Sequence, residues 1–267
     1  MISLTQLLKE VQGNPKAVIL AGAPGAGKSS IVGDVLSGLG LTTLNIDDDF
    51  IKNLKDAGVS LDLKKADAEG RSKAAIAMQA AQKTYKDRLE KEIKNKQSII
   101  IDGTAASYNK TEELKNTLEE AGYDVFMVYV YSSLEKSLKK NEDRFERSKG
   151  EDRSLMPAIV MQTWANVTKN FEPYRNLFGD NFVATTKDKK LIDAQDLDDI
   201  IEKYIVPYIP TDTKPKDEKA KARSEKQKAK LEADIKALMA KENIENSIQY
   251  IVSAEEAQSK LKQFLNG

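Results

Sequence analysis

The sequence of 267 residues contains no cysteine and no histidine. Without cysteine the chain can form no disulfide and offers no thiolate to a metal. Without histidine it lacks the commonest general base and the commonest zinc ligand. Any acid–base chemistry must therefore use carboxylates, lysines or tyrosines.

An excess of charge and long apolar runs are also missing. Lys+Arg and Asp+Glu number 42 each, so no overall basic field indicates a nucleic-acid binder, although local basic patches remain compatible with this balance. No run approaches the roughly 18 apolar residues of a membrane span. The first residues lack the basic and apolar regions of a signal peptide. We expect a cytoplasmic protein without membrane contact.

The most informative stretch is a glycine-rich segment that follows the apolar run 17–21. It reads Gly-Ala-Pro-Gly-Ala-Gly-Lys-Ser, a complete G-x-x-x-x-G-K-[S/T] pattern. Its backbone N–H groups can cradle a phosphate chain, Lys28 can reach the outer phosphates, and the Ser29 hydroxyl can bind Mg²⁺. The pattern predicts a site for ATP and Mg²⁺ formed by Gly22, Ala23, Pro24, Gly25, Ala26, Gly27, Lys28, Ser29 and Ser30.

Strand-like and helix-like segments alternate along most of the chain. The expected strands are 17–21, 41–46, 98–101, 125–130 and 182–185, and the expected helices are 3–11, 30–36, 65–94, 110–121, 156–171 and 197–205. Such alternation is typical of a parallel sheet covered on both faces. We predict an α/β fold of the three-layer P-loop NTPase class, with a mainly parallel five-stranded sheet and a helical C-terminal extension.

The composition changes near residue 210, where prolines bracket polar residues. We predict a first domain over 1–209 with a lid at about 140–156, a linker over 210–216 and a charged extension over 217–267. The lysine-rich part of the extension favours a solvated helical face, and a contact with a protein or nucleic-acid partner is the alternative. Residues 246–253 look β-like, and a short final helix follows Ser253.

Acidic residues follow two of the expected strands. Asp47, Asp48 and Asp49 come after the strand 41–46, and Asp102 comes after the strand 98–101. Because ligands of parallel sheets bind at the carboxyl ends of strands, one aspartate of the triplet can take a proton from an acceptor hydroxyl, and Asp102 can hold Mg²⁺. Thr104 can bind the acceptor or a phosphate. The alternatives are a helix N-cap for the triplet and an Asp-Gly turn for Asp102.

A cluster of cations lies between the strand 125–130 and the next helix. Lys140, Arg144 and Arg147 have the i, i+4, i+7 spacing of one helical face, and Arg153 follows them. Arginine offers paired donors to phosphoryl oxygens, and P-loop kinases place a closing lid at this position. Ordinary surface ion pairs with the interleaved acids are the alternative.

Several of these motifs resemble those of one group, the polynucleotide kinase and zeta-toxin-like P-loop kinases of phages and bacteria. The similar segments are the phosphate loop, Asn45-Ile46-Asp47-Asp48-Asp49-Phe50, residues 99–104, Lys140-Asn141-x-x-Arg144 and residues 153–157. The resemblance covers about residues 15–185. It implies Asp48 as the general base, with Asp47 left open, Arg144 as the principal lid arginine and Lys140 as its partner.

The chain is therefore predicted to transfer the γ-phosphate of ATP to a hydroxyl of a polynucleotide 5′ end, a nucleoside or a nucleotide-sugar. The predicted catalytic residues are Lys28, Asp48, Arg144 and Arg147, and Lys140 and Arg144 also contact the nucleotide. Weaker candidates for acceptor binding are Asp47, Arg71, Thr104 and Arg153. If a phage encodes the protein, its place is the host cytoplasm. The alternatives are an ATPase, which Gly103 disfavours because a catalytic glutamate is expected after Asp102, and a nucleotide-binding assembly protein whose C-terminal helices engage a partner.

Overall fold

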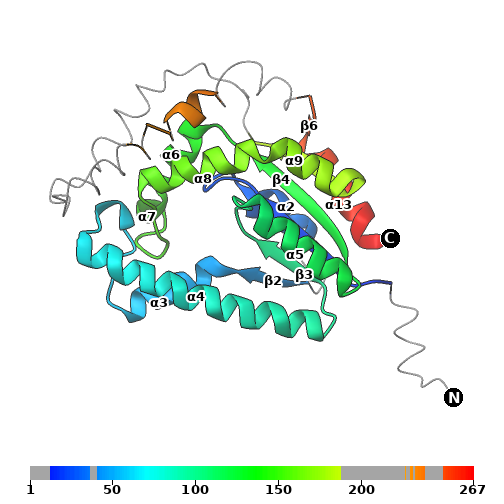
Figure 1. Ribbon diagram of the computed structural model, residues 1–267, viewed down its shortest axis with the longest axis horizontal. Coiled ribbons are helices and arrows are strands. Elements are labelled where there is room, and N and C mark those ends of the chain that lie inside the picture. The colour runs from blue at the N-terminus through cyan, green and yellow to red at the C-terminus, as the bar shows by residue number, and fades with distance from the viewer. Residues whose placement is uncertain (1–12, 37–40, 188–225, 227–228, 231, 238–248) are drawn as a thin grey trace.

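A computed structural model describes residues 13–36, 41–187, 226, 229–230, 232–237 and 249–267 (Figure 1). Its centre is a parallel sheet with the strand order β2-β3-β1-β4-β5-β6. The strands are β1 Lys16–Ala21, β2 Thr42–Asn45, β3 Ile99–Asp102, β4 Asp124–Tyr131, β5 Phe182–Thr186 and β6 Ile251–Val252. All five strands expected from the sequence are present.

The helices connect these strands and cover the sheet. They are α2 Lys28–Leu36, α3 Ile46–Asp56, η1 Leu63–Lys65, α4 Ala68–Lys94, α5 Tyr108–Glu120, α6 Leu134–Glu142, α7 Arg144–Arg147, α8 Pro157–Lys169, α9 Phe171–Phe178, η2 Gly179–Asn181 and α13 Ala254–Asn266. None of the helices within the described residues has the length and apolarity needed to cross a membrane.

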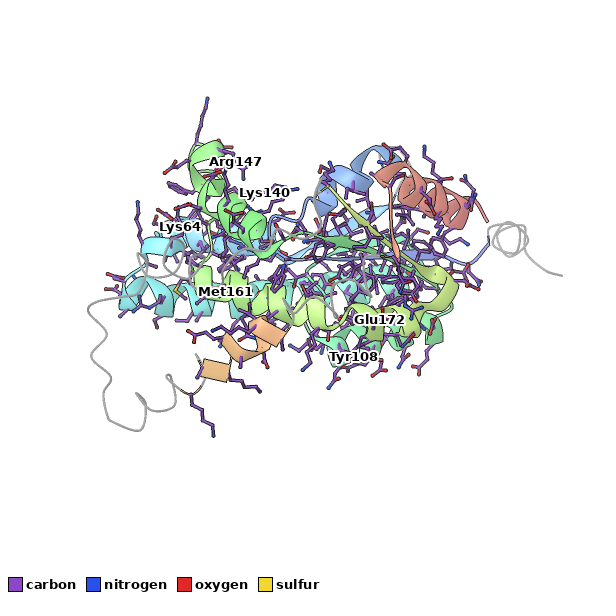
Figure 2. All side chains as sticks on the ribbon, turned by 90° about the horizontal axis from the view of Figure 1, so that it is seen from above. Lys64, Tyr108, Lys140, Arg147, Met161 and Glu172 are labelled. Carbon is purple, nitrogen blue, oxygen red and sulfur yellow. The ribbon has the colours of Figure 1, made fainter. Side chains whose placement is uncertain are left out.

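The central strands are almost wholly apolar because helices pack on both of their faces. In β4, every residue from Val125 to Tyr131 is buried. One face of the sheet packs against α4, α5 and α9 through a core that contains Ile19, Leu118 and Tyr174. The other face packs against α2 and α13 through Ile31 and Leu261. Figure 2 shows α2 and α13 on the side of the sheet opposite to the labelled Tyr108 and Glu172.

The carboxyl ends of the strands meet at one edge. Leu20 of β1 and Asn45 of β2 are both in register with Asp102 of β3, so the segments after these strands are neighbours. These segments are the phosphate loop, the start of α3 and residues 103–107. The sheet therefore brings together three of the sequence motifs.

The prediction of a five-stranded sheet was wrong by one strand. The extension supplies β6, which pairs with β5, and the Thr185 hydroxyl donates to the Val252 carbonyl over 2.9 Å. Helix α13 then packs beside α2. This strand falls within residues 246–253, which look β-like in the sequence, and pairing with the buried β5 stabilises its two residues.

Other boundaries also differ from the expectations. Helix 156–171 is two helices, because α8 ends at Lys169 and α9 begins at Phe171. The expected helices 3–11 and 197–205 and the linker 210–216 lie outside the described residues. The division into domains therefore stays a prediction.

Candidate active site

The phosphate loop depends on backbone conformations that favour glycine. Gly25 and Gly27 have φ values of +78° and +92°. A Cβ atom added to Gly22 would lie 2.5 Å from the Val130 carbonyl oxygen, which leaves no room for a side chain. The Gly22 N–H donates to the Thr104 carbonyl over 3.1 Å and so joins the loop to the segment after β3. Glycine is thus required by both sterics and backbone conformation.

Lys28 curls back over this loop. Its Nζ donates to the Gly22 carbonyl over 2.9 Å, with the Ala23 carbonyl at 3.4 Å. Burial lowers the pKa of Lys28, while the carboxylates of Asp102 and Asp47 favour its charged form. The cation is therefore held where incoming phosphates can replace loop carbonyls as its partners.

Asp102 lies beside the phosphate loop. Its Oδ2 accepts hydrogen bonds from Ser29 Oγ at 3.4 Å and from Asn45 Nδ2 at 3.3 Å. Burial raises the pKa of Asp102, and the charge of Lys28 opposes this shift. The described residues hold no group of three or more carboxylates suited to a metal. A hydroxyl beside one carboxylate nevertheless fits Mg²⁺, which commonly takes one or two protein ligands with phosphates and water.

The acidic triplet lies in the first turn of α3 and not at its N-cap, which is Asn45, so the N-cap alternative was wrong. The Asn45 side chain caps the helix by accepting from the Asp47 N–H over 2.8 Å, and acids near this end favour the helix dipole. The three carboxylates point to different places. Asp48 is exposed and Asp49 pairs with Arg88 at 3.0 Å, whereas Asp47 is close enough to affect the pKa of both Lys28 and Asp102. Asp48 acts on Asp102 more weakly than Asp47 does.

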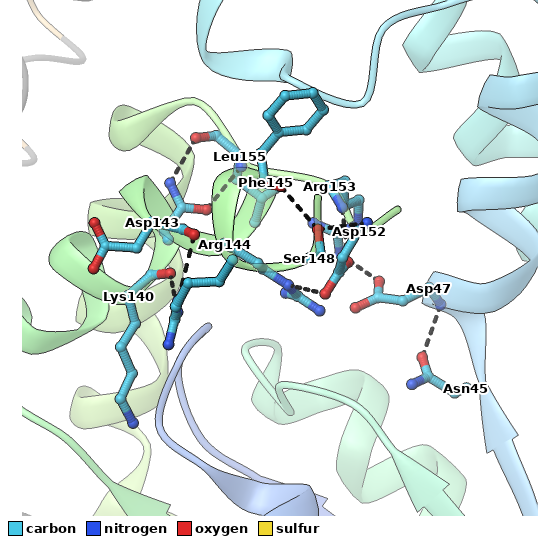
Figure 3. Close-up of polar contacts among 12 residues, drawn as sticks. Asn45, Asp47, Lys140, Asp143, Arg144, Phe145, Ser148, Asp152, Arg153 and Leu155 are labelled. Carbon is cyan, nitrogen blue, oxygen red and sulfur yellow. Dashed lines mark hydrogen bonds and ion pairs between the residues drawn. The ribbon is translucent and has the colours of Figure 1, made fainter. Parts of the chain in front are cut away.

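The lid cations do not share one continuous helix, so the i, i+4, i+7 prediction was wrong. Helix α6 ends at Glu142, and α7 begins after Asp143. Arg147 Nη2 instead donates to the Lys140 carbonyl over 2.8 Å, and Arg144 Nε pairs with Asp152 at 2.5 Å (Figure 3).

Lys140 lies against the phosphate loop. A Cβ added to Gly25 would be 3.0 Å from the Cβ of Lys140, and one added to Gly27 would be 3.8 Å from its Nζ. The labelled Lys140 side chain extends away from the Arg144–Asp152 pair in Figure 3. Lys140 is thus in reach of phosphates on the loop.

Arg153 connects the lid to α3. Its Nη2 forms an ion pair with Asp47 (Figure 3). Its guanidinium lies 5.3 Å from the centre of the Phe50 ring. The side chain is 7% exposed, and its Nε and Nη1 are buried without a hydrogen-bond partner. Buried donors normally find acceptors, so this group is suited to receive additional oxygen atoms.

The two remaining acceptor candidates lie at different distances from this cluster in the fold. Thr104 is adjacent to the loop, because its carbonyl accepts from Gly22. Arg71 lies in the first turn of α4 and donates to the Ala66 carbonyl over 2.7 Å.

Lys187 was not predicted from the sequence as a site residue. It follows β5, and its Nζ donates to Ser30 Oγ over 2.6 Å. Its place at the carboxyl end of an expected strand was the available signal.

Several solved structures are similar to this chain. A complex of AvrRxo1-ORF1 with AvrRxo1-ORF2 aligns with a TM-score of 0.50 and 17% identity over 95% of this chain and 81% of that chain. The PezAT toxin–antitoxin system of Streptococcus pneumoniae gives a TM-score of 0.49 and 14% identity over 89% and 95% of the two chains. The Pnkp1/Rnl/Hen1 RNA repair complex aligns with a TM-score of 0.46 and 19% identity, and the alignment covers 61% of this chain and 47% of that chain. A comparison with curated protein sequences finds no match.

The sequence itself carries the family relationship. The family model described as zeta toxin matches residues 3–195, which is more than half of the chain. The matched part includes the phosphate loop, the acids of α3, Asp102 and the lid. ATP binding and phosphotransfer follow from this membership. The protein is a kinase that belongs to the zeta toxin family.

Proposed function

We propose that the protein transfers the γ-phosphate of ATP to an acceptor hydroxyl, with Asp47 as the general base. The position of Asp47 carries this proposal. Its carboxylate influences Lys28 and Asp102 and pairs with the buried Arg153, so it lies between the phosphate loop and the lid. An acceptor hydroxyl placed there would be next to the terminal phosphate.

Asp47 thereby replaces Asp48, which the family resemblance implied. Asp47 follows Asn45 by two residues, its N–H donates to the Asn45 side chain, and its carboxylate pairs with Arg153. Asp48 is one position further round the helix and is exposed. In the proposed step, Asp47 accepts the hydroxyl proton as the acceptor oxygen forms a bond to phosphorus. The bond from phosphorus to the β–γ bridging oxygen breaks, and ADP leaves.

The cations supply the charge stabilisation. Lys28 donates to the Gly22 carbonyl and Lys140 lies against Gly25 and Gly27 of the loop. Arg153 offers two unpartnered nitrogens beside the proposed base. These groups neutralise charge that spreads over the transferring phosphoryl group. Arg144 takes a supporting role, because its Nε is engaged by Asp152. Arg147 binds the Lys140 carbonyl and so positions the lid.

Mg²⁺ would be held by Ser29 and Asp102, whose oxygens are 3.4 Å apart. When bound, it would neutralise phosphate charge and orient the phosphates for in-line displacement. Thr104 and Arg71 are the proposed contacts to the body of the acceptor. The acceptor class is a polynucleotide 5′ end, a nucleoside or a nucleotide-sugar.

The test is transfer of label from γ-labelled ATP to a panel of these acceptors. We expect one acceptor class to be labelled by the intact protein. Asp47→Asn should lower the rate by about 10²–10⁴, the usual contribution of a general base. Asp48→Asn is the matched control, with the same charge change one residue away, and its transfer rate should fall far less.

Two outcomes would contradict the proposal. Label released only as inorganic phosphate, at a rate unchanged by Asp47→Asn, would exclude phosphotransfer by this site. A large loss in Asp48→Asn with little loss in Asp47→Asn would return the base to Asp48. Retained ATP affinity in each variant would confirm that the base and not the phosphate loop was damaged.

A further inference from the structure

Lys187 lies on the phosphate loop but has no part in the mechanism above. It follows β5, which ends at the same edge of the sheet as β1. Its Nζ donates to Ser30 Oγ over 2.6 Å and lies 3.4 Å from the Ser30 carbonyl. A Cβ added to Gly27 would lie 3.6 Å from the Cδ of Lys187, so its aliphatic stem crosses the loop.

The charge of Lys187 is not balanced by a carboxylate in the part of the chain that the structure describes. Its contacts are with oxygens of Ser30, which carry no net charge, and α2 has no acid in its first turn. Lys28 and Lys140 are close to the same loop. Three ammonium groups near the positive end of a helix repel one another and the helix dipole. A bound polyanion would remove this repulsion.

The strand order decides which phosphate Lys187 faces. Asp47 follows β2 and Asp102 is the last residue of β3, and both strands lie on one side of β1, where the proposed transfer takes place. Lys187 follows β5, on the other side of β1. A triphosphate on the loop with its γ-phosphate near Asp47 therefore has its α-phosphate toward Ser30 and Lys187.

We propose that Lys187 binds the α-phosphate of the nucleotide and is thus a second, lid-independent cation of the nucleotide site. This inference rests on the proposed function for the direction in which the triphosphate lies. It predicts that Lys187 acts equally on ATP and ADP, because both carry the α-phosphate. Lys140, on the lid, should act more strongly on ATP.

The experiment measures dissociation constants of ATP and ADP by calorimetry with the full-length protein. Lys187→Gln should weaken both nucleotides by about tenfold, the usual size for a hydrogen bond to a charged group. Lys187→Arg should restore both to within a few-fold of the intact protein. Lys140→Gln should weaken ATP more than ADP. Lys83→Gln, the same change on the exposed face of α4, is the control and should change neither.

The inference is wrong if Lys187→Gln binds both nucleotides as the intact protein does, or if it loses affinity for ATP alone. It is also wrong if Lys83→Gln weakens nucleotide binding as much, because the loss would then reflect the net charge of the protein and not a contact of Lys187. Label transfer by the intact protein is measured in the same preparations. Absent transfer with a tenfold loss in Lys187→Gln would refute the proposed function and keep this contact, whereas normal transfer with unchanged affinity would do the reverse.

Discussion

The two sides of the active site are held in different ways. On the phosphate-loop side, the shape comes from backbone: glycines with positive φ, and strands in register. On the lid side, the shape comes from side chains far apart in sequence. Arg153 pairs with Asp47, and Lys64 Nζ donates to the Glu142 carbonyl over 2.7 Å.

The lid side is also fastened to the segment between α3 and α4. The Ser154 hydroxyl donates to Asp62 over 2.7 Å, and the Ser154 N–H donates to the Leu61 carbonyl over 3.0 Å. Phe145 of α7 packs with the core under α3 and α4. The backbone of the phosphate loop is therefore prearranged, whereas the lid and the segment between α3 and α4 hold each other in place through side chains.

The largest effect is expected from breaking the phosphate-loop side. Gly22→Ala would force Cβ into the Val130 carbonyl, so the loop must shift, and we expect label transfer to fall below detection. Gly33→Ala is the matched control, since its Cβ would meet nothing within 4 Å in the middle of α2. It should retain activity and gain about 0.5–1 kcal/mol of stability. Equal activity in the two variants would contradict this account of the loop.

The next effect tests how far the phosphate-loop side depends on the C-terminal helix. Leu261 is buried against the sheet, and Gln258 of the same helix donates to the Ile31 carbonyl of α2 over 2.7 Å. Leu261→Ala should lower the free energy of unfolding by about 2–5 kcal/mol, measured with urea. The exposed neighbour Lys262→Ala should change it little. Similar stabilities would show that α13 adds little to the core.

A smaller effect is expected where the lid meets η1, in the segment between α3 and α4. Lys64→Met would leave the Glu142 carbonyl without its charged donor. We expect the free energy of unfolding, measured with urea, to fall by about 1.5–3 kcal/mol. Lys65→Met is the control, because its side chain is 72% exposed. If the lid and the segment between α3 and α4 position the acceptor together, Lys64→Met should also raise KM for the acceptor more than Kd for ADP. An unchanged KM for the acceptor would show that this contact does not affect acceptor binding.

The smallest effect is expected at the opposite end of the strands, away from both sides. Asp124 accepts from Lys16 at 2.8 Å and from Asn14 at 3.0 Å, and these bonds lower the pKa of its carboxyl. Because the folded-state pKa is lowered, this stability is present above the unfolded pKa and is lost as pH falls through the folded one. Asp124→Asn should lower the free energy of unfolding by less than about 1 kcal/mol at pH 7.

Urea denaturation at neutral and strongly acidic pH tests this sign. The difference between Asp124→Asn and the unaltered protein should vanish in acid, where both carry an uncharged side chain. A difference that is larger in acid than at neutral pH would contradict it.

Much of the fold was predictable because its signals are local. The apolar runs 17–21, 98–101 and 125–130 are strands, and the loop motif sits where an expected strand meets a helix. Buried parallel strands must be apolar on both faces, and a phosphate loop requires glycines at fixed spacing. Neither property depends on distant residues.

The details of the site were less predictable. The choice between Asp47 and Asp48 depends on a cap that starts α3 at Ile46, and the roles of Arg144 and Arg153 depend on which carboxylate each meets across the lid. Lys187 contacts Ser30 of the phosphate-loop motif only because β5 ends at the same edge of the sheet as β1. Strand β6 joins the sheet only by pairing with β5, which lies far away in the sequence.

The family, the phosphate loop and the alternation of strands and helices are readable from the amino-acid sequence, since each follows from residues close along the chain. Only the tertiary structure decided which acid of α3 pairs with Arg153, which carboxylate Arg144 meets and where α13 packs. These outcomes depend on contacts between residues more than a hundred positions apart, as in the Arg153–Asp47 and Gln258–Ile31 pairs. The distance between such residues is set by packing rather than by local preference.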